Sequence, residues 1–128
     1  MVITSLGVGG AERLVTSLAE QYVARGHQVA LVRLHGDTEL RPRDARVEVE
    51  NLEMRRSPVG LLAAMARLRR LVRAFNPDVV NSHLVHANIL TRLLRLFTPM
   101  PCLVSSAHNT NEGGRGRMIA YRLTDRLA

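Results

Sequence analysis

The chain has 128 residues, of which 46% are hydrophobic, so it is long and apolar enough to form one compact domain with its own core. This composition excludes disorder, and the lone cysteine, Cys102, excludes an internal disulfide framework. No run approaches the roughly 18 apolar residues that span a bilayer, and Met1 opens no signal peptide. We therefore expect one globular domain over residues 1–128, located in the cytoplasm.

The charge of the chain narrows the choice of partners. All 18 basic residues are arginines, against 11 acidic residues, and the net charge is +7. Arginine forms bidentate contacts with phosphate, so this balance fits nucleic acid, anionic lipid or phosphorylated substrates. Aromatic residues make up only 3% of the chain, which leaves no stacking platform for single-stranded nucleic acid. We therefore expect no nucleic-acid partner.

The first half of the chain predicts the order strand, helix, strand, strand. A short β-prone segment at residues 1–4 runs into the glycine-rich loop 7–10, and a helix is expected over 11–25. The apolar face of that helix is assigned to Leu14, Val15, Leu18, Tyr22 and Val23. A continuous apolar run and an alternating one then predict strands within 27–34 and 47–52, separated by a polar loop.

The second half of the chain alternates helices and strands. Ser57 and Pro58 are a helix cap and a first-turn residue, and the helix they open is expected to end near Phe75. Further strands are expected at 78–81 and 102–105, and further helices at 86–97 and from 115 onward. This order predicts an α/β fold of the Rossmann-like, doubly wound kind, with a mainly parallel sheet and helices on both faces. Because Met1 falls inside the first strand and Ala128 follows no helix cap, we also expect both ends to be truncated.

Three polar features follow strands of this predicted sheet. They are the glycine loop after the first strand, His83 and His86 after the fourth, and His108 with Asn109 after the fifth. Ligands of such sheets bind beyond the carboxyl ends of the strands. If the first and fourth strands are neighbours, these features converge on one cleft.

The glycine loop predicts a contact with phosphate. Gly9 and Gly10 allow close approach of a ligand to the N-terminus of the next helix, which offers free N–H groups. A tight strand-to-helix turn is the alternative. A dinucleotide fingerprint would need a third glycine where the chain has Glu12, and Arg33 stands where an acidic residue would bind ribose, so an NADP site is disfavoured.

His108 is the leading candidate for catalysis. It lies in a polar loop, where its imidazole can donate to a sugar hydroxyl or stabilise developing charge. The alternative is a loop histidine that bonds to the backbone. A zinc site formed by His83, His86 and His108 is disfavoured, because no carboxylate or cysteine accompanies them, and no metal is expected.

The helix that starts at Pro58 combines a basic face with an apolar face. Four arginines share one arc of it: Arg67, Arg69, Arg70 and Arg73. The other arc holds Leu61, Met65, Leu68, Leu71, Val72 and Phe75. This pattern favours packing on the sheet with a solvated arginine face, and that face remains available for anionic lipid or phosphate.

Four segments together resemble the N-terminal half of family 4 glycosyltransferases. They are ITSLGVGGAER at 3–13, RGHQV at 25–29, PDVVNSH at 77–83 and SSAHN at 105–109. The resemblance implies the acceptor-side half of a GT-B fold, in which a second, C-terminal domain binds a nucleotide sugar. It further implies transfer with retained anomeric configuration and without a metal or other cofactor. The acceptor would be lipid-linked or a polysaccharide.

The resemblance also implies roles for individual residues. Gly9 and Gly10 would approach the donor diphosphate, and His108 would touch the transferred sugar. His83, His86 and Asn109 would line the acceptor cleft, and the basic helix would reach the cytoplasmic face of an anionic membrane.

The donor-binding half lies outside the chain, so we expect this chain alone to be inactive and the full-length protein to be a hexosyl-type transferase. The alternatives are a stand-alone binding or scaffold domain that pairs with a separate catalytic subunit and, less favoured, an NADP-binding Rossmann protein.

Overall fold

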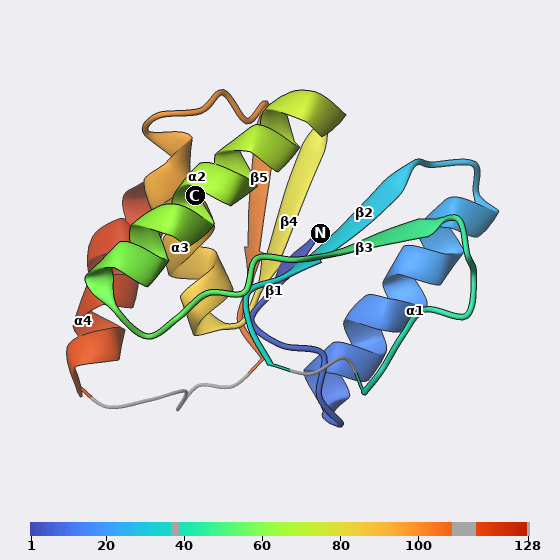
Figure 1. Ribbon diagram of the computed structural model, residues 1–128, viewed down its shortest axis with the longest axis horizontal. Coiled ribbons are helices and arrows are strands. Elements are labelled where there is room, and N and C mark those ends of the chain that lie inside the picture. The colour runs from blue at the N-terminus through green and yellow to red at the C-terminus, as the bar shows by residue number, and fades with distance from the viewer. Residues whose placement is uncertain (37–38, 109–114, 128) are drawn as a thin grey trace.

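The computed structural model describes residues 1–36, 39–108 and 115–127. Within them, five parallel strands form one sheet in the order β3-β2-β1-β4-β5 (Figure 1). The strands are β1 (Val2–Ile3), β2 (Val29–Arg33), β3 (Val47–Asn51), β4 (Val79–His83) and β5 (Cys102–Ser106). The predicted parallel α/β fold is therefore confirmed, and β1 lies between β2 and β4 as the convergence argument requires.

Helices cover both faces of this sheet. Helix α1 packs alone on one face, and the other three helices lie on the opposite side (Figure 1). The helices are α1 (Gly10–Ala24), α2 (Pro58–Phe75), α3 (Val85–Arg95) and α4 (Arg115–Thr124), followed by a 3₁₀ turn at Asp125–Leu127. Strand residues alternate between the two faces, which divides the core into two clusters.

The two clusters show how the alternation works. Ile3 and Leu31 are fully buried against α1, whereas Val2 and Val32, each one position away, are buried on the side of α2 and α3. A central strand that is buried on both faces has no solvent-facing side, and this explains the continuous apolar run that predicted β2.

Helix α2 begins and ends where its sequence predicts. The Ser57 Oγ accepts a hydrogen bond from the N–H of Gly60 at 3.0 Å, which satisfies one free donor of the first turn. At the other end, Asn76 adopts a left-handed conformation with φ of 47°. Asparagine is one of the few residue types other than glycine that tolerate this conformation well.

One apolar assignment on α1 and one on α2 are wrong. Leu14 is 48% exposed because the buried stripe of α1 runs through Val15, Ala19 and Val23, which turns Leu14 to the edge. Leu61 is 40% exposed because the buried residues of α2 begin only at Ala64. In the described part of the chain, no helix has the length and apolar character needed to cross a bilayer.

Candidate functional site

The carboxyl ends of three neighbouring strands bring the predicted features together. The strand register pairs Ile3 of β1 with His83 of β4, and His83 with Ser106 of β5. The glycine loop begins a few residues after Ile3, and His108 lies two residues beyond Ser106. The loop, His83 and His108 thus share one edge of the sheet, the edge at which ligands of this fold class bind.

His83 and His108 contact each other directly. The Nδ1 of His83 lies 3.0 Å from the Nε2 of His108, a hydrogen-bond distance, and the ring centroids are 5.2 Å apart. His83 is only 2% exposed, whereas His108 is half-buried in its loop. His83 therefore contacts His108 from the interior of the protein, and His108 remains accessible from the edge of the sheet.

Burial keeps the imidazole of His83 neutral. Desolvation, and then the adjacent His108, lower the pKa of His83 from 6.5 to about 4. The other ring nitrogen of His83, Nε2, is buried and has no hydrogen-bond partner among the described residues. At neutral pH this ring carries one proton, and its position on Nδ1 or Nε2 determines which histidine donates.

The backbone next to His83 is held in an unusual conformation. Leu84 has φ of 72°, a region that branched residues rarely adopt, and it leads directly into α3. Its N–H donates to the carbonyl of Ser106 at 3.3 Å, which ties the end of β4 to the end of β5. Such strain persists only where surrounding contacts enforce it, and it is common at functional sites.

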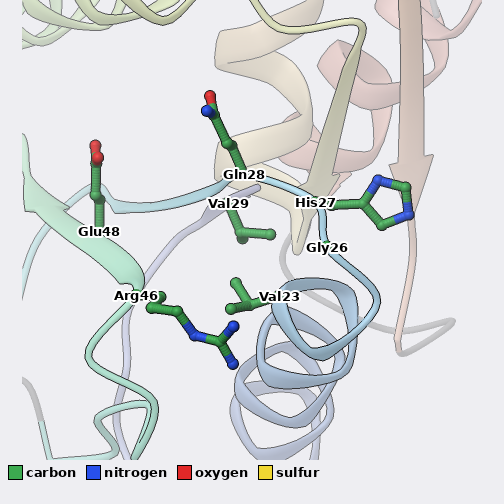
Figure 2. Close-up of a pocket in the computed structure, with 7 residues that line it drawn as sticks. All are labelled: Val23, Gly26, His27, Gln28, Val29, Arg46 and Glu48. Atoms are coloured by element: carbon green, nitrogen blue, oxygen red, sulfur yellow. The ribbon is translucent and has the colours of Figure 1, made fainter.

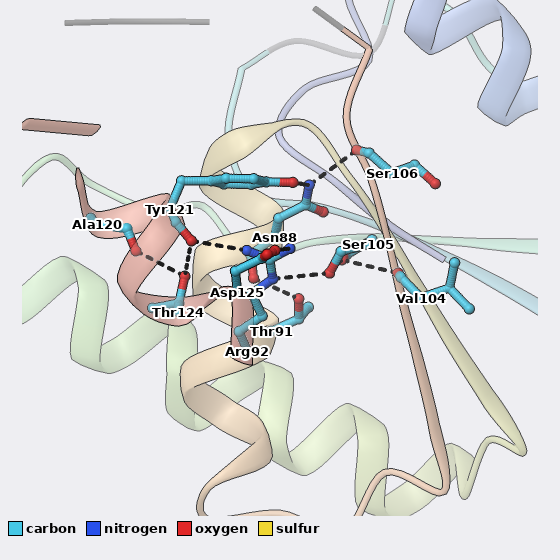
Figure 3. Close-up of polar contacts among 11 residues, drawn as sticks. Asn88, Thr91, Arg92, Val104, Ser105, Ser106, Ala120, Tyr121, Thr124 and Asp125 are labelled. Carbon is cyan, nitrogen blue, oxygen red and sulfur yellow. Dashed lines mark hydrogen bonds and ion pairs between the residues drawn. The ribbon is translucent and has the colours of Figure 1, made fainter. Parts of the chain in front are cut away.

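A buried polar network holds the end of β5 from the other side (Figure 3). The side-chain amide of Asn88 on α3 donates to the carbonyl of Ser106 at 3.0 Å and to the hydroxyl of Tyr121 at 3.2 Å. Asn88 is fully buried. The strand end that leads to His108 is thus fixed by two donors, one from Leu84 and one from Asn88.

Arg92 extends this network into α4. Its guanidinium is 2% exposed and donates to the Ser105 hydroxyl at 3.2 Å, to the Tyr121 carbonyl at 3.2 Å and to the Asp125 carboxylate at 3.0 Å. The Arg92 Cζ also lies 4.3 Å from the centre of the Tyr121 ring, within cation–π range. Arg92 therefore joins α3, α4 and β5.

This network was not predicted from the sequence. Asn88, Thr91 and Arg92 are polar residues at helical spacing on one stripe of α3, and all three are buried. Buried polar side chains require hydrogen-bond partners. The spacing of these three polar residues along one face of the helix was the feature of the sequence from which a buried network could have been predicted.

The glycine loop does not need glycine for its own conformation. None of Gly7, Gly9 and Gly10 has a positive φ, and Gly9 is an extended N-cap of α1. A Cβ on Gly7 or Gly10 would meet nothing within 4 Å, and the nearest atoms to one on Gly9 would be those of the flexible carboxylate of Glu12. Neither backbone strain nor close packing within the chain accounts for the glycines, and the tight-turn alternative loses its main support.

The remaining predicted residues fall on α3, on α2 and outside the described part of the chain. His86 is exposed on the first turn of α3, and Asn109 is outside the described residues. Arg69, Arg70 and Arg73 are exposed on α2. Arg67 is also largely exposed, but it donates to the carbonyl of Leu52 at 3.2 Å and contacts Glu53 at 3.5 Å, so it helps to fasten α2 to the end of β3.

A cavity of about 330 Å³ lies elsewhere, at the end of α1 and the start of β2 (Figure 2). Its lining includes His27, Arg46 and Glu48, and none of the predicted site residues. No set of three or more side chains suited to a metal ion occurs in the described ranges.

The chain matches a known protein family. A search of curated proteins gives no match. The family model described as Glycosyltransferase Family 4 matches residues 8–127. The matched range runs from the glycine loop through His83 and His108 to the end of the last helix. The chain belongs to glycosyltransferase family 4.

Proposed function

We propose that the chain is the acceptor-side domain of a retaining glycosyltransferase. The enzyme would transfer a hexosyl group from a nucleotide sugar to a lipid-linked or polysaccharide acceptor. Membership of the family supports a glycosyltransferase-related role. The observation that carries the proposal is the placement of His108, held by the buried His83 at the same strand edge as the glycine loop.

Gly9 and Gly10 meet the donor diphosphate in this proposal. They lie at the N-terminus of α1, where backbone N–H groups and the helix dipole favour an anion. Because neither conformation nor packing requires these glycines, close approach of a ligand is the physical reason that remains for them. The nucleotide sugar is a co-substrate, and the proposal needs no resident cofactor or metal.

His108 contacts the transferred sugar. A half-buried imidazole at the edge of the sheet can donate a hydrogen bond to an oxygen on which charge develops, and such a donor contributes roughly 10²–10³-fold to a rate. His86 contacts the acceptor in this proposal, and the same role for Asn109, which lies outside the described residues, stays a prediction. A separate donor-binding domain completes the site, so the chain alone does not transfer sugar.

The test is sugar transfer by the native polypeptide that carries this chain, isolated through an antibody to this domain. The variant H108A is compared with H27A, which removes an exposed histidine next to the cavity of Figure 2. The proposal predicts a loss of about 100-fold or more for H108A and little change for H27A. Wild-type transfer by H108A would overturn the assignment. A native mass near 14.2 kDa would instead favour the stand-alone scaffold.

A basic and apolar surface of α2 supports contact with the cytoplasmic face of an anionic membrane. Arg69, Arg70 and Arg73 are exposed, and so are Val59 (76%) and Leu62 (66%) at the start of the helix. Arginines attract anionic headgroups at about 1 kcal/mol each, and exposed apolar side chains insert at the interface.

Vesicle sedimentation tests this contact. Replacing Arg69, Arg70 and Arg73 by Gln should weaken binding to vesicles that contain anionic lipid. Neutral vesicles should bind neither the wild-type protein nor this triple variant. The matched control replaces three exposed arginines elsewhere in the chain, Arg13, Arg25 and Arg41. If both triple variants lose the same amount of vesicle binding, only the net charge of the protein matters. That result would contradict the proposal that α2 carries the membrane-binding surface.

A further inference from the structure

The hydrogen bond between the two histidines has two possible directions. The Nδ1 of His83 and the Nε2 of His108 are 3.0 Å apart, and one proton must lie between them. Either His83 donates from Nδ1 and His108 accepts, or His108 donates from Nε2 and His83 accepts. A neutral imidazole carries only one proton, so each direction fixes the tautomer of both rings.

The buried face of His83 distinguishes these directions. If His108 donated, the proton of His83 would lie on Nε2, which is buried and has no partner among the described residues. If His83 donates, the same Nε2 is an acceptor without a proton. Buried backbone N–H groups that lack a partner are rarer in proteins than buried backbone carbonyls that are left unsatisfied, and we extend this difference to the ring nitrogen of His83. The arrangement in which His83 donates therefore costs less.

We infer that His83 is a positioning residue that donates from Nδ1 to the Nε2 of His108 and so fixes His108 as the neutral tautomer that carries its proton on Nδ1. The Nδ1–H of His108 is then the group that can donate to a substrate oxygen. This role replaces the predicted one for His83, because a side chain that is 2% exposed cannot line an acceptor cleft. The inference rests on the proposed function only for the identity of that oxygen.

The backbone around His83 and His108 fixes the position of one imidazole ring relative to the other. Leu84, directly after His83, donates to the carbonyl of Ser106, and Asn88 donates to the same carbonyl. Ser106 precedes His108 by two residues, so the loop that carries His108 starts from a fixed point. The distance between the two imidazoles is thus set by strand pairing and by α3, and the tautomer is set by His83.

Nuclear magnetic resonance of the 128-residue chain labelled with ¹⁵N-histidine tests the inference at pH 7.5. Long-range ¹H–¹⁵N correlations distinguish a protonated ring nitrogen from an unprotonated one, and H108A and H83N assign the two rings. The inference predicts protonated Nδ1 and unprotonated Nε2 for both His83 and His108. A protonated Nε2 on His108 in the wild-type chain would overturn it.

Two substitutions of His83 separate donation from packing. In H83N the side-chain amide nitrogen occupies the place of Nδ1 and still donates, whereas H83F fills the space without a donor. His108 should keep the Nδ1–H tautomer in H83N and lose it in H83F, with dispersed amide spectra as the control for folding. The same tautomer of His108 in both variants would contradict the inference. If H83F does not fold, the spectra of the wild-type chain and of H83N still show which ring nitrogen of His108 carries the proton.

This experiment is independent of sugar transfer. Loss of the proposed function, for example full transfer by H108A, would leave the tautomers of both rings unchanged. Conversely, the wrong tautomer on His108 would overturn the role of His83 while transfer still depended on His108.

Discussion

The buried imidazole of His83 makes the stability of the domain depend on pH in a defined window. In the folded chain the pKa of His83 is about 4, whereas an exposed histidine titrates near 6.5. As the pH falls below 6.5, the unfolded chain takes up a proton at this position and the folded chain does not. The stabilisation from the neutral ring is therefore present in full above pH 6.5 and is lost as the pH falls toward 4.

The size of this effect follows from the shift in pKa. Each pKa unit corresponds to 1.36 kcal/mol, so a shift from 6.5 to about 4 corresponds to a loss of at most about 3 kcal/mol of unfolding free energy between pH 7 and pH 4. A domain of this size has a total stability of roughly 5–15 kcal/mol, so the loss is measurable. Substitution by asparagine removes the titrating group and retains a donor at the position of Nδ1.

Urea unfolding followed by circular dichroism at pH 7, 6, 5 and 4 measures the effect. Carboxylates also titrate toward the acid end, so the informative quantity is the difference in pH dependence between the wild-type chain and H83N. H83N should lose less stability than the wild-type chain as the pH falls. The control H27N removes an exposed histidine and should follow the wild-type chain. If H83N and the wild-type chain lose equal stability, the reasoning from burial is refuted.

Two further predictions concern the support of the site. Replacing Arg92 by Met removes three hydrogen bonds and leaves the Ser105 hydroxyl and the Tyr121 carbonyl without this donor, so unfolding free energy measured in urea should fall by about 2–3 kcal/mol. The exposed Arg122→Met is its control and should change stability by less than about 0.5 kcal/mol; equal effects would contradict a structural role for Arg92. Gly10→Ala should leave thermal stability unchanged or raised by up to about 1 kcal/mol, because its Cβ meets open space, yet it should reduce sugar transfer by the native polypeptide. Gly60→Ala is the opposite case, because its Cβ would clash with the carbonyl oxygen of Arg55, and it should lower the free energy of unfolding by about 1–3 kcal/mol. A stable Gly60→Ala together with a destabilised Gly10→Ala would contradict both expectations.

The order of elements could be predicted because the signals for it are local. Apolar runs and the Ser57 cap each act within a few residues, and α2 has the bounds that they predict. The position of β1 between β2 and β4 followed from a general rule of doubly wound sheets, and the structure confirms it.

The internal geometry of the site could not be predicted in the same way. His83 and His108 are separated by 25 residues, and their contact depends on the register of β4 with β5, which no local pattern encodes. The burial of Arg92 depends on the packing of α4 against α3, which supplies Tyr121 and Asp125 as partners. The apolar faces of α1 and α2 were misassigned at Leu14 and Leu61 because residue spacing alone does not say where a helix leaves the sheet.

The central claim is that His108 meets the transferred sugar at this edge of the sheet. The most direct measurement follows the imidazole resonances of His108 and His27 while a nucleotide sugar is added to the native polypeptide that carries this chain. The account predicts a saturable shift of the His108 signals and no change at His27, which lies by the cavity at the other end of β2. A shift at His27 with no change at His108 would contradict it.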